Sequence, residues 1–307
     1  MIDRRLKRLS IERGHLDFWL RRGKGSYHLE NIAQIESVLW AALRVTGLLN
    51  RGIANSLDIR LQEIEFAFAS LPVRFDGFTL LHLSDLHIEG VEGLAERLVE
   101  VICPRAVDLC VMTGDYRFAI SGPCDLAQKE MAKVLPAVRS RHGIIGILGN
   151  HDFLEQAEGL ERLGVRMLVN SAFELREGES SIWIVGLDDP HYYGCDDLPK
   201  ALAGVPESAF KILLVHSPEM APEAAAAGFS LYLCGHTHGG QIRFPLVGPA
   251  IVNAKCPRSF IRGPWRYDGL HGYTSAGVGA SLLPVRFGCP PEVTLIRLRK
   301  SASVPTL

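Results

Sequence analysis

Two histidines separated by one residue follow a run of apolar residues in the second half of the chain. His236 and His238 lie in the segment 235–240, which reads GHTHGG and comes directly after the apolar run 229–234. That run is typical of a buried strand, and the glycines after it allow the backbone to turn sharply beside a ligand. Two imidazoles at the end of a buried strand suit metal binding. A His-x-His pair is also common as plain polar surface. The pair therefore indicates a metal site only if other strands also end in metal-binding side chains.

Four more groups of polar side chains follow apolar runs earlier in the chain. Each group begins directly after an expected strand, where open α/β sheets gather their ligands. The residues are Asp85, His87, Asp115, Asn150, His151, Asp152 and His216. Carboxylate, amide and imidazole ligands together suit Mn²⁺, Fe, Zn²⁺ or Mg²⁺ and exclude the all-thiolate sites of soft metals. Five groups in this order, all compatible with metal binding, predict a metal centre.

Periodic apolar patterns predict the elements that bring these groups together. A half-buried strand is expected over 59–68, and strands and helices alternate from residue 78 to the histidine pair. Further strands are expected at 78–83, 109–112, 144–148, 181–186, 212–215, 229–234, 272–275 and 292–299, with helices near 92–102, 126–139, 154–163 and 219–227. No repeat or linker divides the chain after residue 58. The pattern favours one α/β domain in which two sheets pack together.

Composition limits the function classes that fit this chain. It has 307 residues, 47% of them hydrophobic and 22% charged, with a formal net charge of −1. The near-neutral charge argues against nucleic acid as a partner, and no protein partner is evident. Seven cysteines, an odd and widely spaced set without a Cys-x-x-Cys pair, indicate reduced thiols in a reducing compartment. With no visible signal peptide, we expect a cytoplasmic location.

The first part of the chain differs from the rest. We expect a basic, amphipathic helical extension over 1–57, a catalytic domain over 58–300 and a tail over 301–307. Residues 1–24 carry eight Lys or Arg against three acidic residues, and residues 34–51 show helical apolar spacing. Arg44 interrupts that run, which is too short to span a bilayer. Two interpretations stay open: the helix packs on the domain behind a solvated basic tail, or the segment rests on an anionic membrane face.

The order of the polar groups resembles the calcineurin-like metallophosphoesterases over about residues 75–300. The matching motifs are Asp85-x-His87, Gly114-Asp115, Gly149-Asn150-His151-Asp152, His216 and Gly235-His236-Thr237-His238. The resemblance implies a four-layer α/β/β/α sandwich that carries two divalent ions at one edge. It implies one ion on Asp85, His87 and His238. It implies a second ion on Asn150, His216 and His236, with Asp115 bridging the two. His151 then faces the scissile phosphate, and Asp152 orients it from behind.

A two-ion centre of this kind has a defined chemistry. It clamps the phosphoryl oxygens and turns a bridging water into an attacking hydroxide near neutral pH. Mn²⁺ is the ion that we expect, with Fe, Zn²⁺ and Mg²⁺ as alternatives. His151 would supply a proton or a neighbouring positive charge to the leaving oxygen, although a purely structural hydrogen bond is the other interpretation.

Other residues narrow the resemblance to a bacterial branch of small phosphodiesterases. They are the segment 235–242, Phe244-Pro245, Gly277-x-Gly279, Arg286 and Pro290-Pro291-Glu292. One lineage in that branch hydrolyses UDP-2,3-diacylglucosamine to UMP and a lipid phosphate in lipid A assembly, and several members sit at the membrane. This substrate is the favoured prediction, with peripheral contact to the cytoplasmic face of the inner membrane. The alternatives are a phosphodiesterase acting on a soluble nucleotide or other diester, and a non-catalytic binding module.

Several side chains around these motifs have less certain roles. Arg117 and Arg286 could each bind a substrate phosphate bidentately or be an ordinary charge. His82 is expected to be packed behind the ligands, and His191 to lie on a loop that rims the pocket. We expect substrate selectivity from that loop, 188–193, and from the region 252–265. The candidates for an apolar groove are Trp40, Leu43, Phe244, Phe260 and Trp265.

Overall fold

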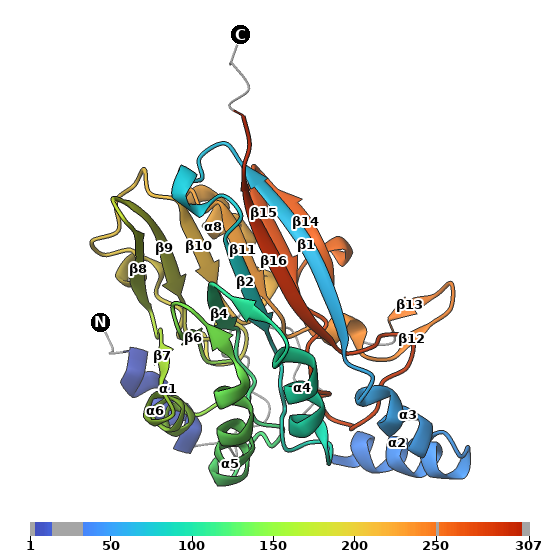
Figure 1. Cartoon of the computed structure of the whole chain (residues 1–307). Coiled ribbons are helices and arrows are strands. Elements are labelled where there is room, and N and C mark those ends of the chain that lie inside the picture. The colour runs from blue at the N-terminus through green and yellow to red at the C-terminus, as the bar shows by residue number, and fades with distance from the viewer. Residues whose placement is uncertain (1–3, 14–32, 250–251, 303–307) are drawn as a thin grey trace.

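Two six-stranded sheets pack face to face between two layers of helices (Figure 1). This computed structural model describes residues 4–13, 33–249 and 252–302. The first sheet has the order β1 (Arg60–Phe68), β16 (Glu292–Lys300), β2 (Thr79–Leu83), β4 (Leu109–Met112), β6 (Ile144–Gly146) and β7 (Val165–Met167). The second has the order β14 (Gly263–Tyr267), β15 (Leu270–Thr274), β11 (Leu231–Cys234), β10 (Lys211–Leu214), β9 (Ser180–Gly186) and β8 (Ser171–Glu177).

Helices cover the outer face of each sheet. The first sheet is covered by α4 (Leu94–Ile102), α5 (Asp125–Val134) and α6 (Leu154–Arg162), and the second by α7 (Leu198–Ala201) and α8 (Ala221–Ala226). Two short ladders, β3 (Ala106–Val107) with β5 (Arg139–Ser140) and β12 (Arg243–Phe244) with β13 (Gly248–Pro249), lie outside the sheets. The predicted four-layer α/β/β/α sandwich is confirmed.

Alternation along the strands divides the core into layers. Leu80 of β2 packs between the two sheets, whereas the next residue, Leu81, packs against the helices of the first sheet. Because both faces are covered, the central strands are apolar at nearly every position, which explains why the sequence shows them as continuous runs. All seven cysteines are free thiols, and five of them are buried.

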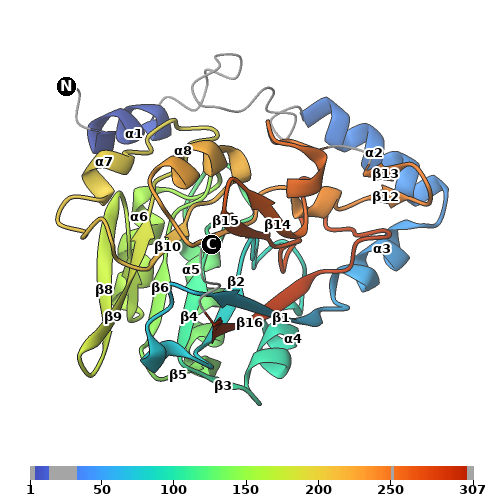
Figure 2. The same cartoon turned by 90° about the horizontal axis from the view of Figure 1, so that it is seen from above.

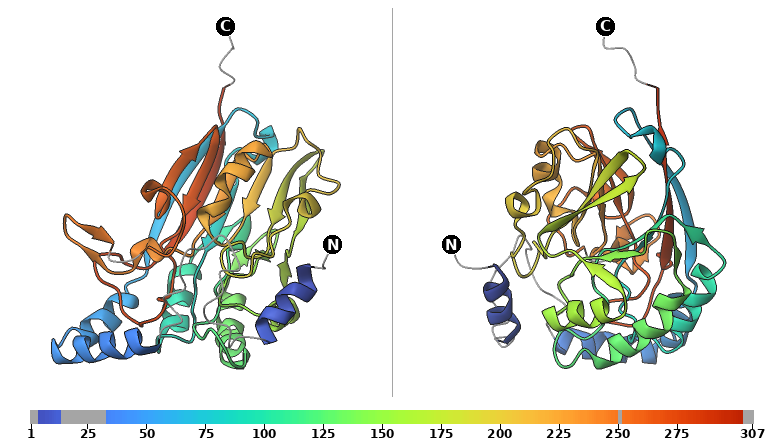
Figure 3. Two further views of the ribbon diagram at one scale, coloured as in Figure 1. Left: turned by 180° about the vertical axis from the view of Figure 1, so that it is seen from behind. Right: turned by 60° about the vertical axis from the view of Figure 1, so that its left-hand side comes forward.

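The strand directions gather the polar loops at one edge of the sandwich. Strands β2, β4 and β6 run parallel, as do β9, β10, β11 and β15. Their carboxyl ends therefore point to the same edge, where the predicted ligand groups begin. Helix α1 (Arg4–Arg13) lies at one side of this edge, and α2 (Ala33–Val45) with α3 (Leu49–Ser56) lies at the other (Figure 3).

The predicted single helix over 34–51 is two helices. Gly47, with φ of +68°, ends α2, and the amides of Gly47 and Leu48 donate to the carbonyls of Arg44 and Leu43. This pattern is the glycine-terminated helix end called a Schellman motif, so α3 begins as a new helix at Leu49. None of the helices in the described part of the chain combines the length and apolar character that spanning a bilayer requires.

Other boundaries differ from the predictions for local reasons. The helix expected near 126–139, with an interruption at Pro136, ends at Val134, and Pro136 lies in the following 3₁₀ turn 135–137. Strand β8 was not predicted, because its sequence SAFELRE lacks an apolar run and sits at the sheet's edge. Two parts of the predictions lie outside the described residues: Arg21, Arg22 and Lys24 of the basic segment, and residues 303–307 of the tail.

Candidate metal centre

The ligand loops bend through unusual backbone conformations directly after their strands. Five of the predicted ligands have positive φ angles, which side chains other than glycine rarely adopt. They are Asp85 (+49°), His87 (+38°), Asp115 (+57°), His236 (+69°) and His238 (+50°). Strained residues of this kind cluster at functional sites, where the surrounding structure holds them in place.

A glycine allows two of these loops to touch. A Cβ atom on Gly235 would lie 2.0 Å from Oδ2 of Asp85, closer than any real Cβ contact. The amide of His236 then donates to Oδ1 of Asp85 at 2.9 Å. The glycine of the GHTHGG segment therefore brings the second sheet's histidines against the first sheet's carboxylate.

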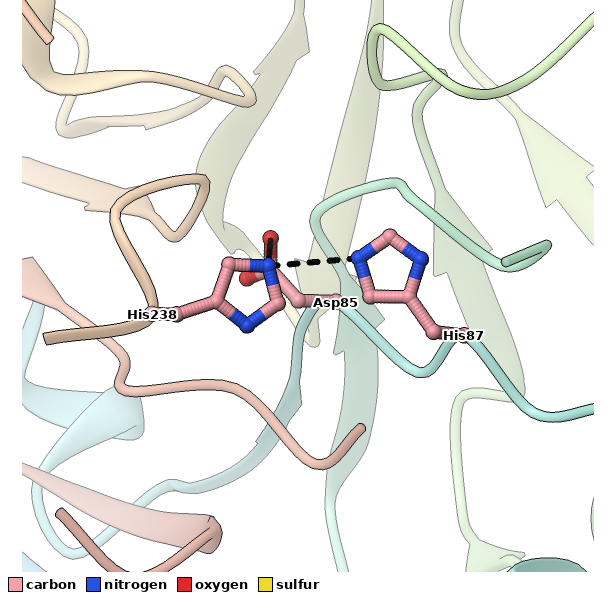
Figure 4. Close-up of side chains that lie close together, drawn as sticks. All are labelled: Asp85, His87 and His238. Atoms are coloured by element: carbon pink, nitrogen blue, oxygen red, sulfur yellow. Dashed lines mark hydrogen bonds and ion pairs between the residues drawn. The ribbon is translucent and has the colours of Figure 1, made fainter. Parts of the chain in front are cut away.

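The first ligand group consists of Asp85, His87 and His238 (Figure 4). Nε2 of His87 lies 3.2 Å from Nε2 of His238, which lies 3.5 Å from Oδ1 of Asp85. Nδ1 of His87 is 2.8 Å from the carbonyl oxygen of Arg117. A carbonyl can only accept a hydrogen bond, so Nδ1 carries the proton and Nε2 presents a lone pair to the group.

The second ligand group consists of Asn150, His216 and His236. Nδ1 of His216 faces the Thr113 carbonyl at 2.7 Å, and Nε2 of His236 faces the Asn253 carbonyl at 2.6 Å. When the two rings are neutral, the opposite ring nitrogens therefore present lone pairs. Both lie 2.9 Å from Oδ1 of Asn150 and 3.3 Å from each other.

Converging lone pairs of this kind need a cation between them. If both rings are neutral, no proton lies among Nε2 of His216, Nδ1 of His236 and Oδ1 of Asn150. Three buried acceptors that face one another are unfavourable unless a positive charge compensates them. The donor set fits a divalent metal ion, with nitrogen and oxygen ligands oriented by their outer hydrogen bonds.

Asp115 lies between the two groups. Its Oδ2 is 3.5 Å from Nε2 of His87 and 3.3 Å from Nε2 of His216. Its Oδ1 accepts from the amide of His151 at 2.9 Å. One carboxylate oxygen is thus within reach of both ligand groups, as a bridging ligand must be.

The electrostatics of the buried cluster favour a bound cation. Burial, and then the neighbouring His151, lowers the pKa of His87 to about 3. Burial likewise lowers the pKa values of His236 and His238, so all three rings are in the neutral, metal-binding form. His216 behaves differently: burial opposes its charged form, but the Asp115 carboxylate raises its pKa to about 10. In the absence of metal, the Asp115 carboxylate thus favours a protonated His216 ring. A bound metal ion would supply the positive charge that this proton supplies.

His151 lies beside the cluster without joining either predicted ligand group. Its Nδ1 donates to the Phe118 carbonyl at 2.9 Å, and its Nε2 lies 4.0 Å from Oδ2 of Asp115. The ring therefore turns Nε2 toward the ligand groups. Because His87, Asp115 and His151 also form a possible ligand group, the position alone leaves a metal-binding role for His151 open.

Asp152 was predicted to orient the His151 ring, and this prediction is wrong, because its carboxylate bonds to backbone amides instead. Its Oδ2 accepts from the amides of Asp115 at 2.7 Å and Gly149 at 2.9 Å, and its Oδ1 accepts from the amide of Tyr116 at 3.0 Å. The Phe118 carbonyl, not Asp152, orients His151. Asp152 instead ties together the two loops that carry Asp115 and Asn150.

Neither arginine considered for phosphate binding is free to bind one. Arg117 is buried and donates to the carbonyls of Ser121 and Gly122 at 2.8 and 2.9 Å. Arg286 is buried, donates to the Ala276 carbonyl at 2.7 Å and lies 3.3 Å from Nδ1 of His238. Both side chains hold loops of the site, and Arg286 also contacts the His238 ring.

The two remaining histidines lie behind the ligands. His82 is buried and bonds to Oγ1 of Thr113 at 2.9 Å, and a relay through Ser84 reaches Asp85, as a packed residue behind the ligands should. His191 is buried as well, so the prediction that it lies at a rim is wrong. Its ring centroid is 4.0 Å from that of His236, and its Nδ1 lies 3.1 Å from the Glu219 carboxylate.

A pocket of about 140 Å³ is lined by several of the proposed ligands, and aliphatic side chains line another part of it. They are Leu39 of α2, Ile242, Leu282 and Leu283. The groove predicted from aromatic residues is wrong for Phe260 and Trp265, whose rings stack at 4.2 Å in the core. Sequence patterns missed the aliphatic lining, because its members come from three distant segments.

The comparisons with known proteins agree with this geometry. The family model for the calcineurin-like phosphoesterases matches residues 78–240, more than half of the chain. The chain belongs to this family. It is therefore a metal-dependent phosphoester hydrolase, and the predicted family is confirmed.

Three relatives show how far the similarity extends. An uncharacterised metallophosphoesterase of Bacillus subtilis, YkuE, is 32% identical over 75% of this chain and 82% of its own length. The phosphodiesterase YaeI of Escherichia coli is 30% identical over 72% of this chain and 82% of its own. A transmembrane protein with a metallophosphoesterase domain from Danio rerio is 29% identical over 86% of this chain and 62% of its own.

Proposed function

We propose that this protein hydrolyses a phosphodiester or pyrophosphate bond with two divalent metal ions. The observation that carries the proposal is the convergence of ring nitrogens and side-chain oxygens on both sides of Asp115. When bound, the two ions would activate water as the nucleophile and neutralise charge on the phosphoryl oxygens. We keep Mn²⁺ as the proposed ion, with Fe, Zn²⁺ and Mg²⁺ as alternatives that the same donors accept.

The chain's own residues divide the remaining work. Asp85, His87 and His238 hold one ion, Asn150, His216 and His236 hold the other, and Asp115 is shared. His151 presents Nε2 to the same centre, where the doubly protonated ring would give the Nε2 proton to the leaving oxygen and keep the Nδ1 proton on the Phe118 carbonyl. Asp152 keeps the Asp115 and Asn150 loops at a fixed separation through their backbone amides.

The substrate that we propose is a nucleotide-diphospho-lipid, with UDP-2,3-diacylglucosamine as the favoured example. The support is the pocket, in which aliphatic side chains share the lining with Asn150, His151 and His236, so that they lie next to the bond that would be cleaved. An acyl chain gains free energy from contact with Leu39, Ile242 and Leu283, whereas a hydrophilic diester does not. A phosphodiesterase acting on a soluble nucleotide is the alternative.

One experiment tests both the chemistry and the substrate. After chelation the protein should hydrolyse neither bis(p-nitrophenyl) phosphate nor UDP-2,3-diacylglucosamine, and added Mn²⁺ should restore both activities. Hydrolysis that survives complete removal of metal would contradict the two-ion proposal. Restored activity on the artificial diester alone would reject the lipid substrate and favour the soluble alternative.

We also propose peripheral contact with an anionic membrane, through α2 and the β12–β13 hairpin. Both elements lie at the same end of the molecule (Figure 2). Side chains of the hairpin, Phe244, Leu246 and Val247, are exposed, as is Val45 of α2. The exposed Arg44 adds positive charge beside them. Apolar side chains next to a cation suit the interface of an anionic bilayer, and the relative from Danio rerio is named as a transmembrane protein.

Vesicle binding tests this contact. The wild-type protein should co-sediment with vesicles of phosphatidylglycerol and phosphatidylethanolamine, and Phe244→Ser combined with Leu246→Ser should lower the bound fraction at least about fivefold, because each exposed side chain adds apolar area. Leu126→Ser, which changes an exposed leucine of α5, is the matched control and should bind as the wild type does. Equal loss in the control, or no binding by the wild type, would reject the proposed surface.

A further inference from the structure

Helix α1 delivers a buried arginine to the edge where the ligand loops lie. Arg8 has no exposed surface, although it belongs to the basic segment that the sequence leaves as either a solvated tail or a membrane contact. Its Nη1 pairs with Oδ1 of Asp188. Its Nη2 donates to the carbonyl oxygen of Asp152 at 2.5 Å and lies 3.3 Å from that of Gly149.

These two carbonyls have a particular position in the chain. Gly149 and Asp152 flank the dipeptide Asn150-His151, which carries one proposed metal ligand and the proposed proton donor. One guanidinium nitrogen therefore holds the peptide groups on both sides of that dipeptide. The same loop is also tied to the loop of Asp115, but through the Asp152 carboxylate and not through Arg8.

The remaining contacts of Arg8 fix the guanidinium itself. Its Nε donates to Oε1 of Glu12 at 2.9 Å, and that oxygen also accepts from the amide of Leu154 at 3.0 Å. The Tyr193 ring stacks on the guanidinium at 3.9 Å. A planar guanidinium that pairs with two carboxylates, bonds to carbonyls and stacks on an aromatic ring is held in one orientation.

A buried charge of this kind is costly unless every partner is present. A salt bridge that served only to attach α1 to the domain could lie anywhere on the surface. The exposed pair between Arg5 of α1 and Glu158 of α6 is an example. Arg8 instead reaches the loop between β6 and α6 at the two carbonyls next to the site. The burial of Arg8 at this place is therefore explained by its bonds to the carbonyls of Gly149 and Asp152.

We propose that Arg8 is a positioning residue of the hydrolase, which fixes the Asn150-His151 dipeptide so that both side chains reach the metal centre. It contacts neither substrate nor ion, and it acts through the backbone of the loop. The inference rests on the proposed two-ion function. It goes beyond that function by assigning the N-terminal helix, which lies outside the matched family region 78–240, a part in the site.

The test is calorimetric titration of Mn²⁺ into metal-free protein, combined with steady-state kinetics on bis(p-nitrophenyl) phosphate. In Arg8→Gln, the affinity for one of the two ions should fall about tenfold, while the other ion binds as in the wild type. The reason is that Asn150 belongs to only one ligand group. The value of kcat should fall about tenfold with little change in KM, because Arg8 does not touch substrate. Arg5→Gln is the matched control and should leave both ions and kcat unchanged.

A double variant separates positioning from folding. Arg8→Gln leaves the Asp188 carboxylate buried without its partner, which can lower the melting temperature by itself. Arg8→Gln with Asp188→Asn removes that charge, so the melting temperature should recover while the weakened ion and the low kcat remain. Arg8→Lys keeps the charge but loses the planar guanidinium that bonds to several partners at once. It should show the same loss of affinity for one of the two ions.

The possible outcomes distinguish this inference from the proposed function. Wild-type affinity for both ions and wild-type kcat in the double variant would overturn the role of Arg8 and leave the two-ion function intact. Equal weakening of both ions would also overturn it, since that result indicates general destabilisation. If the wild-type protein itself fails to bind two Mn²⁺ ions, the proposed function fails first.

Discussion

Replacing Asp115 with alanine is expected to remove both ions and to lower kcat by at least about 10⁴-fold. The reason is its place between the ligand groups: Oδ2 lies 3.5 Å from Nε2 of His87 and 3.3 Å from Nε2 of His216. Elemental analysis of the purified variant, beside its turnover on bis(p-nitrophenyl) phosphate, gives both quantities.

Two further variants make the Asp115 experiment specific. Asp115→Asn keeps an oxygen that can accept from the His151 amide but removes the negative charge, so the loop stays in place while the shared ligand weakens. It should therefore fold as the wild type does and still lose most of its turnover. Asp268→Asn, in the exposed turn between β14 and β15 at the opposite end of the strands, should change neither metal content nor rate. An Asp115→Ala protein that keeps two ions would contradict the bridging role.

The ligand-bearing loops could be predicted from the sequence because each one directly follows a strand that is buried on both faces. An apolar run such as 109–112 identifies the strand, and the first polar residues after it mark the edge of the sheet. The polar side chains that follow the strands can then be expected at one edge, and the prediction needs no knowledge of contacts between distant segments. This is why Asp85, Asp115 and His216 could be placed together from their positions alone.

Contacts between distant segments could not be predicted in this way. Arg8 bonds to carbonyls more than 140 residues away, and in the sequence it is one of several basic residues with no pattern of its own. The pocket has the same origin, since Leu39 and Leu283 meet only after α2 has packed beside the site. Long-range contacts of this type join the N-terminal helices to the domain.

The error over Asp152 has a different cause. Neighbouring residues in a turn point in different directions, so proximity in sequence to His151 did not imply contact with its ring. The Asp152 carboxylate turns inward to three backbone amides, and the ring turns outward to the Phe118 carbonyl. The break in the predicted helix 34–51 was more accessible, because Gly47 is the residue that commonly ends a helix.

His151→Ala is expected to keep both ions and to lower kcat about 10³-fold, the size typical of a lost general acid. The ring is absent from both proposed ligand sets, but its Nε2 lies only 4.0 Å from Oδ2 of Asp115. Metal content therefore decides between two roles. A variant that loses an ion together with its activity would make His151 a ligand, as the alternative grouping with His87 and Asp115 allows.

The leaving group provides the more discriminating measurement. p-Nitrophenolate leaves without needing a proton, whereas an alkoxide is a poor leaving group unless it is protonated as the bond breaks. If His151 donates that proton, His151→Ala should slow an alkyl diester about tenfold more than it slows bis(p-nitrophenyl) phosphate. His142→Ala, at the start of β6 and paired with Glu177, is the matched control and should affect neither substrate. An equal loss on both substrates would show that His151 serves the reaction without transferring a proton.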